Sequence, residues 1–367
     1  MIGLIKVNVK NLEDYLSIIY KAKSQVVSLS ELGDKIGKQE EKLKTFGYGS
    51  PYLIEFNVND ENKRVVLESV RPGGFGHDHF SDRARIALWQ HSAFNKLPKH
   101  VHSIDVGAFT TDGSIKSLGN CCECFIITWF VDGKPYARDL ERIREQKNIT
   151  QLDKDRCKAL SNYLAVIHST KKDSPELYTR RIRELIGSGE CIMGLCDSYP
   201  SGLEYINEKD LCNIEKKSVE WRWKIKQRFA HRCSQVHGDF HPWNILFQKG
   251  EDFTVLDRSR GEWGEPADDL SAMSINYIVY SLLLHGKLEG SFETLFDLFW
   301  RNYLDKTGDM EVFRVIQPFY VWRGLVLASP IWYPELNPSV RIGILNFVRN
   351  MLKIDIFDIK DVNSYIK

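Results

Sequence analysis

The chain has 367 residues, of which 43% are hydrophobic, 27% charged and 12% aromatic. This composition is typical of a soluble globular protein and excludes long disordered stretches, while the length favours two lobes that share a cleft over one core. Fifty Lys and Arg against 49 Asp and Glu leave a formal net charge of +1. Such a balance excludes an overall field that would attract nucleic acid or an anionic membrane.

Targeting signals and disulfides are not expected. Lys6 and Lys10 interrupt the N-terminal apolar residues, and no run reaches the ~20 apolar residues that span a bilayer. The eight cysteines show no framework spacing, which favours reduced thiols in a cytoplasmic protein. Cys121 and Cys124 form a C-x-x-C, but no second pair of ligands has a matching spacing, so buried strand thiols are expected there rather than zinc.

Residues 1–44 combine apolar positions at helical spacing with a charged run, and we expect an accessory extension of one or two helices. From Thr45 the pattern changes to strands and glycine turns. The predicted elements are a glycine turn at 46–50, a hairpin of strands 52–58 and 64–70, a glycine-rich loop at 71–79, a helix ending near Phe94, and strands near 100–108 and 121–131.

The rest of the chain is predominantly helical in pattern. Helices are predicted at 138–146, 153–168, 174–187, 210–233 and from about Asp269 onward. Between the last two, apolar segments at 236–247 and 253–257 predict a further hairpin. The expected fold is therefore α+β, with a helical extension at 1–44, a small β-rich N-terminal lobe at 45–131 and a larger, mainly helical lobe at 132–367.

Three oxygen-bearing side chains converge on this second hairpin. Phosphoryl transfer needs a carboxylate to orient or deprotonate the attacking hydroxyl, and oxygen ligands that hold Mg²⁺ against the phosphates. Asp239 follows the first apolar segment, Asn244 lies at the other side of the same loop, and hairpin pairing would bring Asp257 beside Asn244. The spacing therefore indicates a phosphotransferase.

The segment His237-Gly-Asp-Phe-His-Pro-Trp-Asn-Ile-Leu246 resembles the signature of the aminoglycoside phosphotransferase and choline kinase-like family. That family is similar in fold to the protein kinases, so the resemblance implies a two-lobed protein-kinase-like fold. The roles that it implies are Asp239 as catalytic base, with His237 and His241 in the same catalytic loop, and Asn244 and Asp257 as magnesium ligands.

Further segments resemble the family in the same order, from about Thr45 to Tyr280. Residues 264–270 resemble a Gly-Asp-Pro-x-x-Asp-Leu segment in which Asp269 would brace the catalytic loop. Residues 164–168 resemble the end of the helix beneath that loop, and residues 127–133 resemble the strand and hinge that join the lobes.

Nucleotide contacts are expected from the N-terminal lobe and the hinge. A glycine loop directly before a hairpin could cover phosphates with its backbone N–H groups, and the resemblance implies hinge contacts to the nucleotide. The candidate residues are Gly47, Gly49, Ser50, Glu68, Arg85, Thr128 and Phe130.

Glu68 departs from the family pattern, because it stands where the resemblance implies a phosphate-binding lysine. Arg83 or Arg85 occupies the place of the lysine's usual glutamate partner, so an inverted ion pair with Glu68 is one hypothesis. Arg64 or Arg71 could supply the cation instead. Arg258 and Arg260, which follow Asp257, could orient an anionic substrate or cover the loop.

The expected activity is transfer of the terminal phosphate of ATP or GTP, with Mg²⁺, to a hydroxyl of a small metabolite or antibiotic. Neither nucleic acid nor a membrane is expected as a partner, and the acceptor and the oligomeric state are left open. Four aromatic residues could form a wall for a sugar or a quaternary amine, or belong to the core: Tyr320, Trp322, Trp332 and Tyr333. A nucleotide-binding pseudokinase is the alternative. A protein kinase is disfavoured by the short interval between Asp257 and Asp269.

Overall fold

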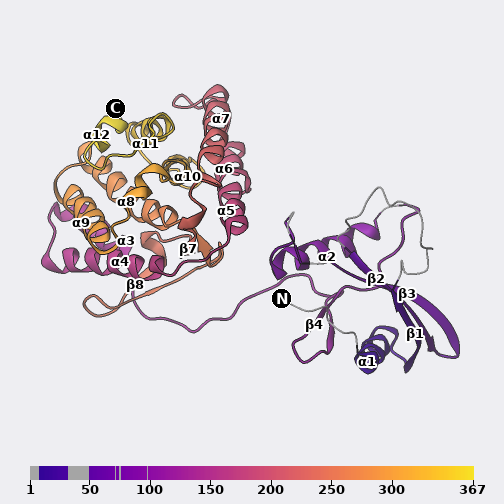
Figure 1. The fold of residues 1–367 in the computed structure, drawn as a ribbon. Coiled ribbons are helices and arrows are strands. Elements are labelled where there is room, and N and C mark those ends of the chain that lie inside the picture. Colours follow the sequence, from indigo (N-terminus) through magenta and orange to yellow (C-terminus); the bar gives the residue numbers. More distant parts are fainter. Residues whose placement is uncertain (1–7, 32–48, 71, 74–75, 97) are drawn as a thin grey trace. The chain divides into compact units, whose positions relative to one another are not determined.

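The computed structural model describes residues 8–31, 49–70, 72–73, 76–96 and 98–367. The chain divides into two compact units, Met1–Thr128 and Trp129–Lys367, and mixes helices with small sheets (Figure 1). None of the described helices combines the length and the apolar character that crossing a bilayer requires.

The first unit contains an antiparallel sheet in the order β1-β2-β3, formed by Ser24–Glu31, Gly49–Val58 and Glu61–Val70. Asn59 and Asp60, the two residues between β2 and β3, both have positive φ (49° and 60°), as in the primed turns that match strand twist. Helix α1 (Val9–Tyr20) buries Leu12 and Leu16 in one cluster with the alternate β2 residues Ile54, Phe56 and Val58. The predicted hairpin is confirmed.

Two predictions for this part of the chain are wrong. Residues 24–31 form strand β1 rather than a helix, because Ser24–Glu31 pairs with the edge of β2 and carries β-branched residues that suit a strand. Residues 121–131 have no regular structure, and their large apolar side chains, such as Trp129, are exposed. An apolar run indicates a strand only where a neighbour supplies ladder hydrogen bonds, and the described residues supply none here.

The remaining elements of this unit are one helix and a small hairpin. Helix α2 (Phe80–Phe94) confirms the prediction for this stretch, with the His79 backbone N–H donating to Asp82 Oδ2 at 2.8 Å across its first turn. Strands β4 (Gly107–Phe109) and β5 (Ile115–Ser117) pair with each other.

The second unit is mainly helical (Figure 1). Its helices are α3 (Tyr136–Gln146), α4 (Gln151–Ser169), α5 (Pro175–Gly187), α6 (Ile192–Ser198), α7 (Glu208–Ile225), α8 (Ala267–His285), α9 (Gly290–Thr307), α10 (Gln317–Ala328), α11 (Pro338–Met351) and α12 (Val362–Ile366), with short 3-10 helices η1 (Ala230–Arg232), η2 (Pro242–Asn244) and η3 (Met310–Arg314). The predicted helices are confirmed with shifted ends. A capping box starts α4: the Thr150 N–H donates to Asp153 Oδ2 at 2.7 Å, and Thr150 Oγ1 accepts from the Asp153 N–H at 3.3 Å.

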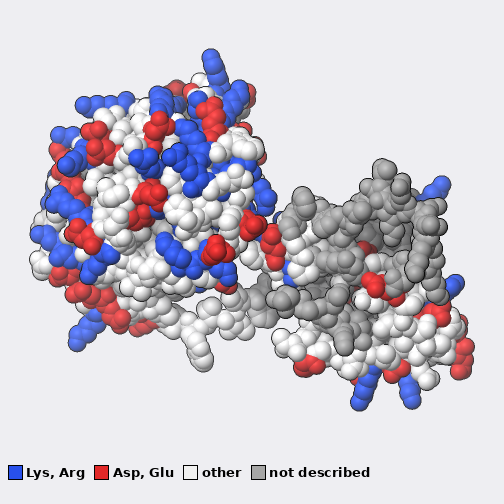
Figure 2. All heavy atoms as spheres, in the orientation of Figure 1, with Lys and Arg blue, Asp and Glu red and all other residues white. Residues whose placement is uncertain are grey.

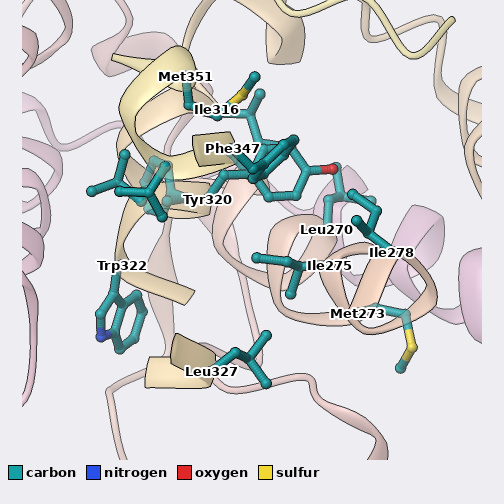
Figure 3. Close-up of a cluster of buried hydrophobic side chains, with 14 of the residues drawn as sticks. Leu270, Met273, Ile275, Ile278, Ile316, Tyr320, Trp322, Leu327, Phe347 and Met351 are labelled. Atoms are coloured by element: carbon teal, nitrogen blue, oxygen red, sulfur yellow. The ribbon is translucent and has the colours of Figure 1, made fainter. Parts of the chain in front are cut away.

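Helix α8 forms the centre of this unit, with buried residues on all its faces. Figure 3 shows α8 side chains such as Leu270 and Ile275 facing Tyr320 of α10 and Phe347 of α11. Each fully buried side chain of this size contributes about 1.5–3 kcal/mol, so the interior strongly fixes α8. On the face shown in Figure 2, acidic and basic side chains of this unit are interspersed, as expected from the near-neutral charge.

Short strands hold the loop that contains the motif. Strand β7 (Ser234–Gln235) pairs with β10 (Trp263–Gly264), and β8 (Ile245–Phe247) lies between β6 (Lys134–Pro135) and β9 (Phe253–Val255). The pairing of Ile245 with Val255 confirms the predicted second hairpin. The loop therefore starts on one small sheet and ends on another.

Candidate functional site

The loop between β7 and β8 turns sharply at Gly238. Its φ is +84°, a conformation that side chains of L-residues rarely adopt, and a Cβ there would lie 3.2 Å from Arg260 Cβ. The turn places the half-buried side chain of Asp239 between Gly238 and the fully buried Phe240.

Asp269, in the first turn of α8, holds the start of this loop. Its carboxylate accepts the N–H groups of His237 at 2.8 Å and Gly238 at 2.7 Å, and lies 3.1 Å from His168 Nε2. Burial alone raises the pKa of Asp269, but the hydrogen bonds from His168 and the backbone bring the pKa below its usual value. The helix N-terminus also favours a negative charge. An ionised, fully buried carboxylate therefore fixes the loop backbone.

Sequence analysis did not identify Arg323, the closest charged neighbour of Asp239 in the site. This buried residue of α10 donates from Nη1 to Asp239 Oδ1, and from Nη2 to Gly238 O at 3.0 Å and Asp268 Oδ1 at 2.7 Å. One feature of the sequence could have identified Arg323: it is the single charged residue inside the apolar segment Phe319–Ala328. An arginine buried in such a segment requires anionic partners.

Burial and Arg323 act in opposite directions on the pKa values of Asp239 and Asp268. Burial raises the pKa of Asp239, but Arg323, followed by His241, lowers it below the ordinary value. Burial dominates at Asp268 and raises its pKa to about 6, against the effect of Arg323. Asp239 is therefore an anion across the neutral pH range and a weak base.

The two motif histidines lie on either side of Asp239. His237 is buried, and its Nδ1 accepts the Asp239 N–H at 3.3 Å, while Nε2 is buried without a hydrogen-bond partner among the described residues. His241 Nδ1 accepts the Trp243 N–H at 3.2 Å. His241 Nε2 is 3.7 Å from Asp239 Oδ2, too long for a hydrogen bond, and burial lowers the pKa of His241 despite this carboxylate.

The second hairpin places Asn244 and Asp257 at the ends of adjacent strands. Asn244 Nδ2 donates to Asp239 O at 3.1 Å, which leaves its Oδ1 for another ligand, and its carbonyl accepts the Leu256 N–H at 2.8 Å. Asp257 is exposed, has a left-handed φ of 56°, and makes no hydrogen bond or ion pair with a described residue. Its carboxylate is therefore available.

These two residues fit Mg²⁺ better than a metal that needs an all-protein site. No group of three or more His, Cys, Asp or Glu among the described residues could hold a metal ion. Mg²⁺ is commonly bound by one or two protein oxygens together with waters and phosphate oxygens. One amide oxygen and one free carboxylate, on adjacent strand ends, match that requirement.

A cavity of about 220 Å³ borders the hairpin and is lined by Asp257, Arg258, His237 and Tyr163, among others. Arg258 covers the loop: it donates from Nε and Nη2 to Val236 O at 2.9 and 2.7 Å, and from Nη2 to Glu262 O at 3.0 Å. Of the two roles considered for this arginine, the structural one therefore agrees with its contacts.

The candidate residues of the first unit are not brought together by contacts. Gly47 lies outside the described residues, and Gly49 and Ser50 belong to β2, paired with β3, rather than to a turn. Glu68 and Arg85 are exposed, and the side chain of neither makes a hydrogen bond or ion pair with a described residue.

The other residues considered for nucleotide binding also form no defined site in the described part of the chain. Arg83 instead donates to the carbonyls of His77 at 2.9 Å and Asp78 at 3.2 Å, so the described residues contain no inverted ion pair. Thr128 and Phe130 lie in the exposed segment without regular structure, on either side of the division between the units.

Two of the four aromatic wall candidates belong to the core. Tyr320 and Trp322 are 0% and 1% exposed, and they point to different sides of α10 (Figure 3). The ring of Trp322 is contacted by the guanidinium carbons of Arg323 at 3.7 Å and Arg260 at 4.7 Å from its centroid. Trp332 and Tyr333 are exposed at 64% and 36%.

No family model matches this sequence, and no curated protein sequence matches it. Among solved structures, an ethanolamine kinase from Plasmodium vivax is 15% identical with a TM-score of 0.35, covering 97% of this chain and 83% of that one. The choline kinase LicA from Streptococcus pneumoniae is 13% identical with a TM-score of 0.34, covering 94% and 98%. The amicoumacin kinase hAmiN is 12% identical with a TM-score of 0.40, covering 87% and 90%. Likenesses of this size do not assign the chain to a family.

Proposed function

We propose that this protein is a small-molecule kinase that transfers the terminal phosphate of ATP or GTP to a hydroxyl group. The observation that carries the proposal is the single loop and hairpin that present Asp239, Asn244 and Asp257, with Asp239 held by Arg323. Structural carboxylates are normally paired, whereas Asp257 has a free carboxylate on a strained backbone, which favours a ligand-binding role.

Asp239 orients the acceptor. Since Oδ1 is bonded to Arg323, Oδ2 is the oxygen available to the acceptor hydroxyl. The hydroxyl oxygen bonds to the terminal phosphorus, the bond to the bridging oxygen breaks, the nucleoside diphosphate leaves, and the hydroxyl proton passes to Asp239. A carboxylate with a lowered pKa suits a loose transition state, in which the proton moves late and positioning supplies most of the catalysis.

Asn244 and Asp257 would hold Mg²⁺. When bound there, the ion would neutralise negative charge on the phosphates. Asn244 Oδ1 is oriented for this by the bond from its Nδ2 to Asp239 O, so one loop sets both the proposed base and the proposed metal ligand. Asp269 keeps that loop in place through the backbone.

The N-terminal lobe at 45–131 is proposed to bind the nucleotide, with the acceptor bound by the helical lobe at 132–367. A nucleotide-binding pseudokinase remains the alternative, and Glu68 in place of a lysine is the observation that favours it. The complete set of Asp239, Asn244 and Asp257 favours the enzyme, because a protein that only binds nucleotide has no use for Asp239.

The test is phosphate transfer from ATP or GTP with Mg²⁺ across a panel of hydroxylated compounds, comparing wild type with Asp239→Asn. We expect acceptor-dependent turnover that falls by at least about a hundredfold in the variant. Nucleotide binding without turnover on any acceptor would instead support the pseudokinase.

A further inference from the structure

Two arginine residues lie close to the proposed catalytic loop. Arg181 of α5 and Arg260, which follows β9, are both near Gly238, the residue before Asp239. A Cβ built on Gly238 would lie 3.2 Å from Arg260 Cβ and 4.0 Å from Arg181 Nη2. Burial raises the pKa of Asp239, and Arg260 is among the charges that lower it, after Arg323 and His241.

Neither guanidinium is saturated with partners. Arg260 Nη1 donates to Glu190 at 2.9 Å, but that carboxylate is 76% exposed, and Arg260 Nε is buried without a hydrogen-bond partner among the described residues. Arg181 Nη1 donates to Glu184 at 2.9 Å, and the same carboxylate also pairs with Arg180 at 2.7 Å. Nη2 of Arg181 and Nη2 of Arg260 have no hydrogen-bond partner in the described part of the chain. Each arginine therefore keeps guanidinium donors that no described residue uses.

The buried carboxylates of this site are already engaged. Arg323 binds both Asp239 and Asp268, so they offer little to a cationic acceptor. The Trp322 ring, which could attract a quaternary amine, is contacted by two guanidinium groups instead. Apart from Asp257, which is proposed to hold Mg²⁺, and Glu190, which already pairs with Arg260, a positively charged acceptor would meet arginines rather than carboxylates or an open aromatic face.

We propose that Arg181 and Arg260 form an anion-binding site for the acceptor, so that the acceptor is a hydroxylated compound with a carboxylate or phosphate group. Guanidinium groups bind such anions through paired, charge-assisted hydrogen bonds. The anion bound beside Gly238 brings the acceptor hydroxyl to Asp239 Oδ2. This inference rests on the proposed kinase activity, which it extends by naming the acceptor class.

The experiment compares pairs of acceptors that are close in shape and differ in charge. Glycerate is set against glycerol, and galacturonate against galactose, with choline and kanamycin as cationic compounds. Wild type is compared with Arg260→Gln, Arg181→Gln and the control Arg301→Gln. Arg301 of α9 pairs with Asp297 at 2.6 Å, so it matches the arginine–carboxylate pair of Arg181 on a different helix.

We expect the protein to phosphorylate glycerate in preference to glycerol, or galacturonate in preference to galactose. Arg260→Gln and Arg181→Gln should raise the acceptor KM on the order of tenfold to a hundredfold, since each removes charge-assisted hydrogen bonds, while the nucleotide KM stays within about twofold. Arg301→Gln should change neither constant. Preferred turnover of neutral or cationic compounds, or an unchanged acceptor KM in both variants, would overturn the inference.

Two further measurements are needed. The first distinguishes an anionic acceptor from the phosphate of the nucleotide, and the second distinguishes the anion-binding site from the proposed kinase activity. A rise in the nucleotide KM, without a rise in the acceptor KM, would assign the arginines to the nucleotide's terminal phosphate and overturn the acceptor class. Calorimetric titration with glycerate, galacturonate and inorganic phosphate measures anion binding without turnover. If wild type binds these anions, Arg260→Gln does not, and no phosphate transfer occurs, the kinase proposal is rejected and the anion site is kept. If wild type binds none of these anions, the anion site is rejected.

Discussion

Arg323 donates a hydrogen bond to Asp239 across 84 positions of sequence, from the middle of a buried helix to a loop between short strands. The same guanidinium bonds Asp268 at the start of α8, so two helices and the loop meet at one side chain. Truncating it would leave the buried carboxylate of Asp268 without its partner, which costs far more than losing an exposed ion pair.

Replacing Arg323 should change how activity depends on pH. Arg323 opposes the effect of burial and lowers the pKa of Asp239, so the wild-type activity should stay constant well into the acid range. In Arg323→Gln the pKa of Asp239 rises, and the acid limb of the kcat/KM profile should move to higher pH. Arg323→Lys should partly restore the wild-type position.

The matched control for this prediction is Arg341→Gln. Arg341 is equally buried but donates to backbone carbonyls, including those of Tyr333 at 2.9 Å and Leu336 at 3.1 Å, rather than to carboxylates. Its loss should lower stability without moving the acid limb. Superimposable limbs for Arg323→Gln and wild type would contradict the electrostatic role.

Asp269→Asn should destabilise the protein by about 2–5 kcal/mol, because the negative charge is lost and the NH2 group that replaces one carboxylate oxygen cannot accept a hydrogen bond from the buried groups facing it. The pKa of Asp269 is lowered in the folded protein, so its contribution is present above the ordinary carboxyl pKa and is lost as pH falls through the folded value. The difference from wild type in urea unfolding should therefore shrink in acid.

Asp355→Asn is the comparison for Asp269→Asn. Asp355 pairs with Lys224 at 2.8 Å on the exposed surface, where such pairs contribute little to stability. Equal losses of unfolding free energy in the two variants would count against the bracing role of Asp269.

Asn244→Ala and Asp257→Asn should each raise the Mg²⁺ concentration needed for half-maximal transfer by at least about tenfold, because the first removes a proposed oxygen ligand and the second removes the negative charge of the other. Titrating Mg²⁺ at fixed nucleotide measures this. Asp252→Asn, in the turn of the same hairpin, should match wild type. A metal requirement unchanged in both ligand variants would place the metal elsewhere.

Gly324→Ala should affect both stability and activity. A Cβ on Gly324 would lie 2.4 Å from Val348 Cγ2, so α10 and α11 must separate, at a cost of about 1–3 kcal/mol, and Arg323 must move with α10. At Gly343 of α11 the nearest atom would be 3.4 Å away, an ordinary contact. Gly343→Ala should therefore be neutral or stabilising in thermal unfolding, with unchanged activity.

Local sequence patterns predicted much of this fold. The helices of the second unit and both hairpins follow from side-chain periodicity and turn residues. The spacing predicted Asp257 beside Asn244, and the Asn244 carbonyl accepts the N–H of Leu256, the residue before Asp257. These features depend on residues close in sequence, so a local pattern is sufficient for them.

The parts that were missed depend on distant partners. Strand β1 exists because it pairs with β2, beyond the stretch 32–48, and its own residues contain only a weak signal. The apolar segment 121–131 has strand-like residues without strand neighbours. Arg323 reaches Asp239 only because α10 packs on α8, which no spacing rule predicts.

The backbone of the proposed catalytic loop is hydrogen-bonded to α8, a largely buried helix of its unit. The amides of His237 and Gly238 both donate to Asp269, which is 0% exposed. Deuterium from the solvent can reach these two amides only when the start of α8 separates from the loop, so they should exchange as slowly as the interior of α8 itself. The proposed catalytic loop should thus be one of the last parts of the second unit to open.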